Sequence, residues 1–351
     1  TDMYTASVAL PAVYGTGSPK GNNAEMKTDG WELSLSWRDS FKLGGKPFDY
    51  SIKAMVWDSK SVITKYVNDT GSLGTVKGFI ENGGSPSSYY VGMTVGEIWG
   101  YTVAGLFRDQ ADIDSSAIHD FVQASDKVTR PGQVKIADLD GNGFIDPGNF
   151  AVDDHGDLRI IGNQSPRYRY GVNLSARWNG IGLSVFLQGV GARDWYPGSD
   201  AGMFWGKYGR PFFALIPSIH NYTDDMYSAE RNNWDTAYWP RMTTYQSNGT
   251  KNWTRLLEIP NTRYIQSAAY LRVKNIQLDY SFPKHICSAI RLQGLKIYVN
   301  AENLFTFTPL HKYAPNFDPE GLSYDSDFAS AADGYTYPIL KSVTVGVNIT
   351  F

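Results

Sequence analysis

The feature that most constrains this chain is an alternation of apolar and polar residues, which is cleanest at the end of the sequence. Residues 341–351 read KSVTVGVNITF, and from Val343 to Phe351 every second residue is apolar. A strand turns successive side chains to opposite faces, so this segment has one wholly apolar face. It suits a soluble sandwich with that face inward, or a transmembrane barrel with that face toward lipid.

Other segments share the alternation, and the connections between them differ sharply in length. Strands are predicted at residues 31–38, 48–65, 97–108, 168–178, 181–191, 269–282 and 294–305. Asn179-Gly180, a dipeptide preferred in two-residue hairpins, joins two of them. Residues 194–262 and 308–338, in contrast, are long and aperiodic. Short turns alternating with very long loops are typical of outer-membrane barrels, so the pattern favours an all-β transmembrane antiparallel barrel with long extracellular loops.

Composition agrees with a protein of strands and loops. The 351 residues include 23 Tyr, 17 Phe and 10 Trp, while only 19% are charged, and the net charge of -3 offers no basic surface for nucleic acid. The single cysteine, Cys287, excludes an internal disulfide. No run of about 18 apolar residues predicts a transmembrane helix. Because the chain opens on Thr1 without a signal peptide, we expect a fragment or processed piece of a longer protein.

The sequence has no recognisable catalytic constellation. None of its histidines lies in an HExxH motif, and no GxSxG nucleophile elbow is present. Acid pairs such as Asp224 and Asp225 could serve a glycosidase, but paired acids in loops are usually solvated. We therefore expect that the chain is not an enzyme and requires no cofactor for catalysis.

An acidic loop is the candidate metal site. Residues 138–146 read DLDGNGFID, which places side-chain oxygens at alternate positions around glycine turns, as hard cations require. The predicted ligands of a structural Ca²⁺ or Mg²⁺ are the side chains of Asp138, Asp140 and Asn142, the carbonyl of Phe144, and Asp146 directly or through water.

The twelfth position of this loop departs from a calcium-binding EF-hand. It is Asn149 instead of the usual bidentate Glu, so Asp153 or Asp154 would have to substitute. The alternative to a metal site is an acidic turn held by hydrogen bonds of its own Asp and Asn side chains. Both interpretations stay open at this point.

The aromatic-rich loop at residues 194–262 is the candidate contact surface. Loops of this length are uncommon in compact domains unless they are functional. Aromatic faces suit sugar rings and also the surface of a protein partner. The best candidates for contact with a ligand or a lid are Trp195, Trp205, Trp234 and Trp239. Alternatively, these rings pack the loop against itself and the barrel rim.

Several blocks of sequence, in order along the chain, point to a known family. They are NAEMKTDGWELSLSW at 23–37, GEIWGYTVAGLF at 96–107, PGQVKIADLDGNGFID at 131–146, IGNQSPRYRYG at 161–171, YLRVKNIQLDYSFP at 270–283, LKIYVNAENLF at 295–305, and FDPEG at 317–321, with Tyr337-Pro338 before the last strand. In this order they resemble the C-terminal barrel portion of the SusC/RagA-type TonB-dependent outer-membrane transporters of Bacteroidetes.

The resemblance implies a large barrel plugged by an N-terminal domain. Residues 1–351 would form the C-terminal part of that barrel, with the plug domain and the first barrel half outside this chain. It further implies a SusD-like surface lipoprotein as lid, energy supplied by TonB–ExbB–ExbD through the missing N-terminal part, and import of oligosaccharides across the outer membrane. Peptides are the second substrate class, and a surface all-β binding module such as an adhesin is the rival function.

The closing strand acquires a role in this setting. Its apolar face would contact outer-membrane lipid. Phe351, a terminal aromatic on the same face, resembles the signal by which barrel-assembly machinery recognises outer-membrane strands.

Overall fold

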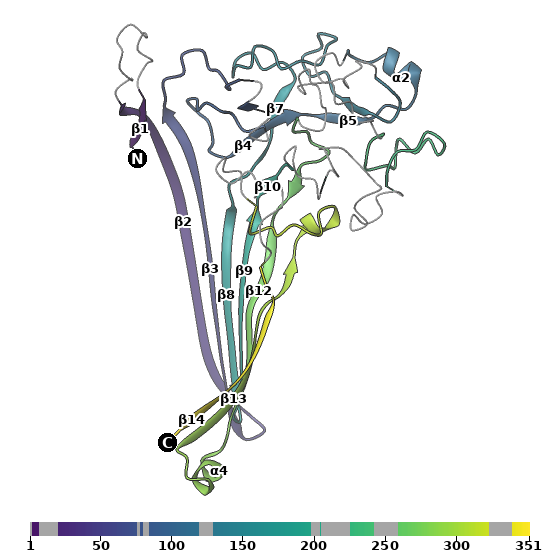
Figure 1. Ribbon diagram of the computed structural model, residues 1–351. Coiled ribbons are helices and arrows are strands. Elements are labelled where there is room, and N and C mark those ends of the chain that lie inside the picture. Colours follow the sequence, from purple (N-terminus) through teal and green to yellow (C-terminus); the bar gives the residue numbers. More distant parts are fainter. Residues whose placement is uncertain are drawn as a thin grey trace.

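The main body of the protein is one antiparallel sheet of eight strands. The computed structural model describes residues 2–6, 20–75, 78–79, 84–118, 129–197, 204, 225–241, 259–322 and 339–351. In sheet order the strands are β1 (Asp2–Ala6), β2 (Lys20–Leu43), β3 (Lys46–Lys65), β8 (Arg167–Trp178), β9 (Ile181–Ala192), β12 (Tyr270–Ser281), β13 (Gly294–Phe307) and β14 (Ser342–Thr350). Most of them run side by side along the length of the molecule (Figure 1).

The connections at the two ends of the sheet differ as the sequence predicts. At the lower end in Figure 1, Gly44-Gly45 joins β2 to β3 and Asn179-Gly180 joins β8 to β9. All four residues have positive φ, which the two-residue hairpin turn requires and which Gly and Asn tolerate best. The short helix α4 (Lys284–Ala289) lies between β12 and β13 at the same end. The long connections gather at the other end.

We refer to the described parts of residues 66–166, 193–269 and 308–341 as the upper region. Its small strands are β4 (Glu97–Tyr101), β5 (Val103–Leu106), β6 (Val134–Ile136), β7 (Leu158–Asn163), β10 (Asp194–Trp195) and β11 (Gln266–Ser267), and its short helices are α2 (Gln110–Asp114) and η3 (Pro309–Lys312). They pair as β4–β7, β5–β6 and β10–β11, outside the large sheet. No helix among the described residues is long and apolar enough to cross a membrane.

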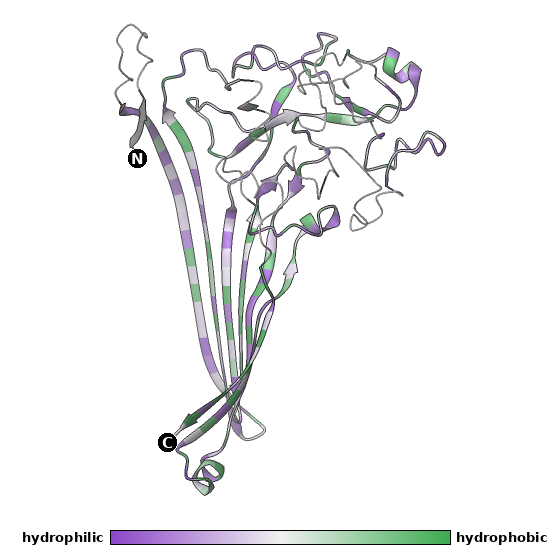
Figure 2. Ribbon diagram, in the orientation of Figure 1, coloured by the Kyte–Doolittle hydropathy of each residue, from purple (hydrophilic) through white to green (hydrophobic). Residues whose placement is uncertain are grey.

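The strand pairing gives the large sheet two faces of opposite character. One row of paired residues crosses seven strands and is apolar throughout: Trp37, Ile52, Leu174, Val185, Ile276, Ala301 and Val343. The neighbouring row lies on the other face and is polar throughout: Arg38, Ser51, Ser175, Ser184, Gln277, Asn300 and Thr344. We call these the outer face and the inner face. The strands accordingly show alternating hydropathy along their length (Figure 2).

Many apolar side chains of the outer face are exposed. Leu35 and Trp37 are each 61% exposed, and Val345 is 73% exposed. A soluble sandwich would bury this stripe, because contiguous exposed apolar surface is unfavourable in water. The polar inner face and the exposed outer face match the wall of a membrane barrel, in which lipid contacts the outer face. The closing strand follows the same rule, as the sequence predicts.

β2 and β3 continue beyond the apolar stripe. β2 has 24 residues, and its apolar outer-face positions begin at Trp31 and end near the lower turn. Above Trp31 the strand carries polar contacts instead. Lys27 pairs with Asp29 at 2.9 Å, and the hydroxyls of Thr28 and Ser61 lie 2.8 Å apart. This hairpin therefore extends above the apolar band of the wall.

One predicted strand does not belong to the wall. Residues 97–108 form β4 and β5, which pair with different partners in the upper region. All five residues of β4 are buried, because the segment lies inside the packed upper region. The prediction of a single strand was therefore wrong. The other predicted strands are confirmed, and β2 is longer than the alternation at 31–38 indicates.

Candidate functional site

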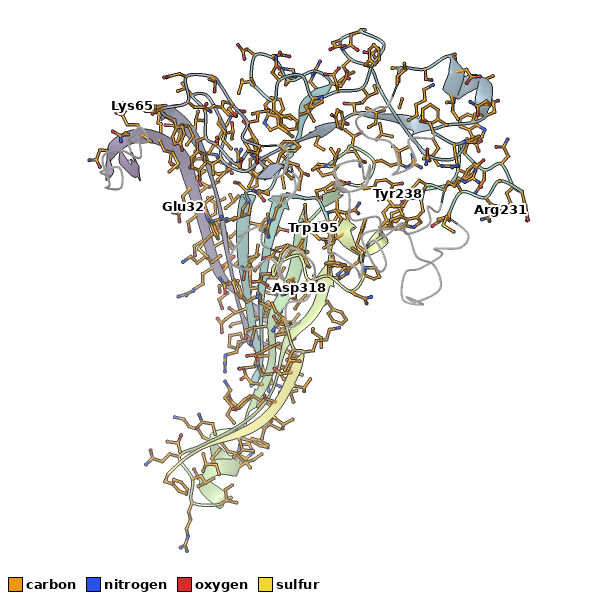
Figure 3. All side chains as sticks on the ribbon, turned by 45° about the horizontal axis from the view of Figure 1, so that its top comes forward. Glu32, Lys65, Trp195, Arg231, Tyr238 and Asp318 are labelled. Carbon is orange, nitrogen blue, oxygen red and sulfur yellow. The ribbon has the colours of Figure 1, made fainter. Side chains whose placement is uncertain are left out.

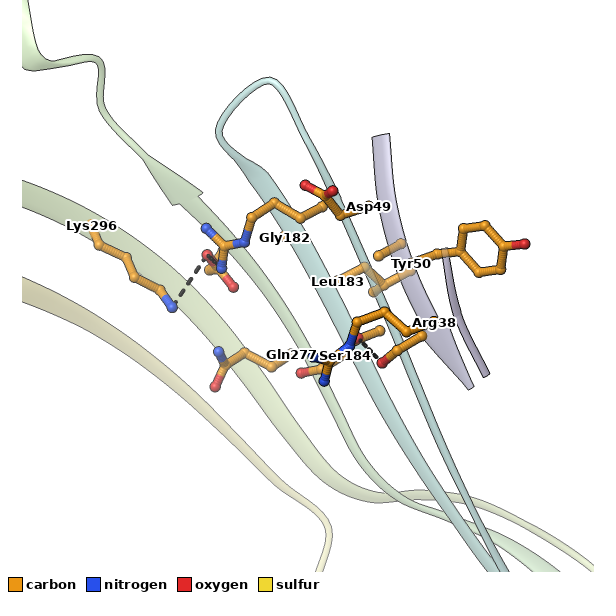
Figure 4. A pocket seen from close by; sticks show the side chains of 13 residues that line it. Arg38, Asp49, Tyr50, Gly182, Leu183, Ser184, Gln277 and Lys296 are labelled. Atoms are coloured by element: carbon orange, nitrogen blue, oxygen red, sulfur yellow. Dashed lines mark hydrogen bonds and ion pairs between the residues drawn. The ribbon is translucent and has the colours of Figure 1, made fainter. Parts of the chain in front are cut away.

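The inner face carries a polar groove of about 370 Å³ (Figure 4). It crosses the wall from β2 to β13, and its lining includes Arg38, Asp49, Arg177, Gln277 and Lys296. The hydroxyls of Ser51 on β3 and Ser175 on β8 also line the groove and lie 2.7 Å apart. The groove thus presents charged groups of both signs beside uncharged donors and acceptors.

A buried carboxylate organises the lower part of this groove. Asp279 is 6% exposed, and its Oδ1 lies 3.2 Å from Lys296 Nζ and 3.5 Å from Arg177 Nη2. A Cβ added at Gly182 would lie 2.6 Å from Asp279 Oδ2, so the glycine leaves room for the acid. Burying a carboxylate is costly unless cations accompany it, and here Arg177 on β8 and Lys296 on β13 supply them.

Two of the predicted contact tryptophans form the core of the upper region. Trp195 and Trp239 are both 0% exposed. The Trp195 ring lies 4.9 Å from Phe317, and the Trp239 ring stacks on Tyr264 with centroids 5.8 Å apart. Phe204 contacts both tryptophans. These rings pack the upper region against itself, as the alternative interpretation expects; Figure 3 shows Trp195 beneath the upper loops.

The other two predicted contact tryptophans are Trp234 and Trp205. Trp234 is half-buried and packs against this core, whereas Trp205 lies outside the described residues. Beside Trp239, the rings of Tyr238 and Tyr313 stack at 3.6 Å with 3° between their planes. Trp195 and Trp239 have no exposed surface through which a ligand would touch them. Direct contact with a ligand or lid therefore stays a prediction, and Trp234 is the described tryptophan that offers surface for it.

An ion cluster joins the upper region to the wall, and sequence reasoning missed it. The guanidinium of Arg272, 3% exposed on β12, pairs at 2.5 Å with both Asp318 and Glu320. Lys274 adds a 2.8 Å bond to Glu320. Arg193 donates to the carbonyl of Pro319 at 3.2 Å. We call this arrangement the FDPEG clamp, because it holds residues 317–321 against the end of the barrel wall.

The acidic loop brings together a different set of carboxylates from the predicted one. Oxygens of Asp138, Asp140 and Asp157 lie within 4.8 Å of one another. Asp157 is 0% exposed, and it accepts hydrogen bonds from the N–H groups of Leu139 at 2.6 Å and Asp146 at 3.2 Å. Asp157 follows the motif by eleven residues, so no local spacing signalled it. Asp153 and Asp154, the substitutes expected from sequence, lie outside this cluster.

Hydrogen bonds of Asp and Asn side chains hold the loop in shape. Asn142 Oδ1 accepts from the N–H of Phe144 at 2.7 Å, so its amide nitrogen faces Asp140 at 3.1 Å and Asp146 at 3.2 Å. Asp146 also accepts from the N–H of Gly148. The amide nitrogen of Asn142 thus faces the two carboxylates, and the ligand roles of Asn142, the Phe144 carbonyl and Asp146 stay predictions. The Phe144 side chain is 47% exposed.

Two carboxyls of the cluster have perturbed acidity in opposite directions. The backbone N–H groups of Gly143 and Gly141 lower the pKa of Asp138. Burial raises the pKa of Asp157, and the charges of Asp140 and Asp138 add to that effect. The cluster therefore concentrates negative charge, and the ionised form of Asp157 is the least favourable of the three because this residue is buried. The chemistry of hard oxygen donors fits a divalent cation such as Ca²⁺.

Comparison with known proteins shows which proteins this chain resembles. No family model matches the chain. It is 24% identical to the TonB-dependent receptor P3 of Formosa agariphila over 97% of the chain, and 22% identical to the TonB-dependent receptor P26 of the same organism over the whole chain. These matches cover 30% and 32% of the two receptors, so the chain spans about a third of the length of the curated relatives it matches.

The solved structures show the same architecture. The chain superimposes in full on part of the RagAB peptide importer in its closed-closed state, with a TM-score of 0.60, 17% identity and 32% coverage of that chain. The open-open state gives a TM-score of 0.60 at 18% identity. At these identities the likeness concerns the fold, which is the antiparallel wall with its upper region. The chain is therefore similar along its length to part of three TonB-dependent receptors, and its fold matches part of the RagAB transporter structures.

Proposed function

We propose that this chain forms part of the wall and the outward-facing region of a TonB-dependent importer of oligomeric nutrients. The observation that carries the proposal is the pair of rows across seven strands, one apolar and the other polar, with the apolar face exposed at Trp37, Ile52 and Val343. Such a wall separates lipid from a wet lumen. The long upper region then provides the outer side on which substrate is captured.

Oligosaccharides are the substrate class we favour. The inner-face row from Ser51 to Thr344 consists of hydroxyl and amide side chains, and these donate to and accept from sugar hydroxyls without requiring a charged ligand. Peptides are the second candidate, supported by the likeness to RagAB structures, which are described as those of a peptide importer. At 17% identity those structures indicate the fold and not the substrate, and the uptake experiment below distinguishes the two classes.

The proposal includes partners and further segments of the same machine. β1 and β14 are the edges of the described sheet, and unpaired backbone groups in lipid are very costly. Additional strands would complete the wall, with a plug inside it and TonB–ExbB–ExbD delivering energy through that N-terminal part. A SusD-like lipoprotein would close the upper region from outside. The two-component name RagAB of the similar structures supports such a lid.

The test is uptake by cells that carry the full-length protein and by cells that lack it. Defined neutral oligosaccharides, charged oligosaccharides and peptides of matched size are offered separately, and depletion from the medium is followed. We expect depletion of an oligosaccharide pool that stops when TonB is removed. Depletion of peptides alone would show that the substrates are peptides and not oligosaccharides. Surface binding that persists without any uptake would instead favour the adhesin.

A further inference from the structure

A cluster of carboxylates in the upper region is unused by the proposed import function. Asp138 and Asp140 come from the acidic loop, and Asp157 stands directly before β7. We propose that these three residues bind one calcium ion, which fastens the acidic loop to the β4–β7 sheet of the upper region.

The spacing of the oxygens suits calcium. All three ligand oxygens lie within 4.8 Å of one another. Calcium binds oxygen at ~2.3–2.6 Å, so a single ion can reach oxygens spread over that distance. Magnesium binds at ~2.0–2.1 Å, demands near-ideal octahedral geometry and usually keeps several waters, whereas calcium accepts irregular sets of oxygens such as this one. The cluster therefore suits calcium better than magnesium.

The charge of the cluster has no protein counterion in the described part of the chain. No Lys or Arg among those residues forms an ion pair with Asp138, Asp140 or Asp157. The nearest arginine in sequence, Arg159, donates to the carbonyls of Gly156 and Leu158. A divalent cation would supply the missing positive charge, and it would also offset the burial of Asp157.

A buried hydroxyl beside the cluster is a second, independent observation. Tyr101 is 1% exposed, and its Oη has no hydrogen-bond partner among the described residues. In the β4–β7 ladder Tyr101 lies opposite Leu158, the neighbour of Asp157. Burial raises the pKa of Tyr101, and the charges of Asp157 and Asp146 add to that effect. A buried phenol without a partner, within reach of the charge of Asp157, indicates a ligand that the phenol contacts directly or through a bound water.

The ion would stiffen one part of the upper region. The loop pairs with Ile118, which forms an isolated bridge with Phe144 and whose N–H donates to the carbonyl of Gly143 at 2.8 Å. Asp157 reaches β4 through β7. Calcium therefore links segments far apart in sequence without touching the barrel wall, and its loss should loosen residues 138–157 while the wall persists.

The test uses the full-length transporter purified in detergent, with calcium alone as the probe. Bound ⁴⁵Ca²⁺ is measured by equilibrium dialysis for the wild type, Asp140→Asn, Asp157→Asn and the matched control Asp153→Asn. We expect each of the first two variants to bind one calcium fewer per chain, and the control to bind as the wild type does. Because Asp140 is exposed, its variant keeps the fold even if Asp157→Asn does not.

Two further readouts separate a metal site from a merely structural turn. Chelation should speed protease cleavage within residues 138–157 in the wild type, with no such change in Asp140→Asn. Tyr101→Phe should weaken calcium binding on the order of tenfold, as loss of an outer contact to a metal site does. Equal calcium binding by the wild type, Asp140→Asn and Asp157→Asn would overturn the proposal. Loss of the ion in Asp153→Asn would overturn the ligand assignment.

Discussion

The barrel wall and the upper region use the same kinds of side chain in opposite ways. Trp37 in the wall is 61% exposed, whereas Trp239 in the upper region is 0% exposed. In the wall, backbone hydrogen bonds across the sheet fix each residue, and apolar side chains point away from the protein. In the upper region, aromatic rings pack against one another and the sheets are only two-stranded.

The difference shows what stabilises each part. The wall is held by strand pairing and by its surroundings, because lipid replaces the protein core on the outer face. The upper region stands in water and needs a core of its own, which its tryptophans and tyrosines supply. The FDPEG clamp is the junction at which the two kinds of stabilisation meet. The following substitutions test this division.

Trp239→Ala should have the largest effect, and it should be confined to the upper region. Removing a fully buried tryptophan costs about 3–5 kcal/mol through lost burial and the cavity left behind. Hydrogen exchange in the full-length protein should show faster exchange around β10 and β11 with the wall unchanged. The half-buried Trp234→Ala is the control and should cost less. A loosened wall in Trp239→Ala would contradict the division.

Arg272→Ala should follow, with an effect at the junction. It leaves Asp318 and Glu320 without their main cation, and breaking such a pair costs about 3 kcal/mol, at the low end because Lys274 still contacts Glu320. Protease cleavage within residues 317–322 should increase. Arg169→Ala, an exposed arginine on β8, should change cleavage little. Equal cleavage in both variants would show that the clamp holds nothing.

Leu278→Arg should disturb the wall alone. Leu278 lies on the outer face and is 54% exposed, and an arginine facing the middle of the bilayer costs about 2–4 kcal/mol. The neighbouring Gln277→Arg points to the lumen and is the matched control. We expect less folded, heat-resistant barrel in outer membranes for Leu278→Arg only. Similar losses for both variants would mean that the two faces are not distinct.

Deleting Phe351 should have the smallest effect on the finished barrel. Its side chain is 82% exposed and follows the end of β14, so its loss removes little packing. The predicted role is in assembly, so folded protein should accumulate more slowly after induction while the unfolding midpoint stays the same. Phe351→Tyr keeps the terminal aromatic and should assemble normally. Unchanged assembly of the deletion would remove the proposed signal.

Most of the wall could be predicted from sequence, because lipid and lumen impose a period of two on every strand. The hairpin at Asn179-Gly180 and the closing strand follow directly from that period and from turn chemistry. The prediction for residues 97–108 failed because a strand buried on both faces leaves no periodic signal that separates it from wall.

In the upper region the sequence identifies individual motifs, but not the residues that these motifs contact. The acidic loop and the FDPEG segment stand out in the sequence, but their partners Asp157, Arg272 and Arg193 come from distant segments that pairing brings close. Residue type also does not reveal burial: nothing local distinguishes Trp195, which is buried, from Trp37, which is exposed. Long-range contacts, not local pattern, decide these sites.

The length of the β2–β3 hairpin sets the clearance between the membrane and the upper region. The apolar stripe at residues 31–43 spans about 44 Å along the strand, or about 30 Å of membrane normal at a tilt near ~45°, which matches a bilayer's hydrocarbon core. Residues 20–30 of the same strand add about 25 Å more at the same tilt. Loops that continue from the hairpin at that height stand beyond the lipid headgroups, in water.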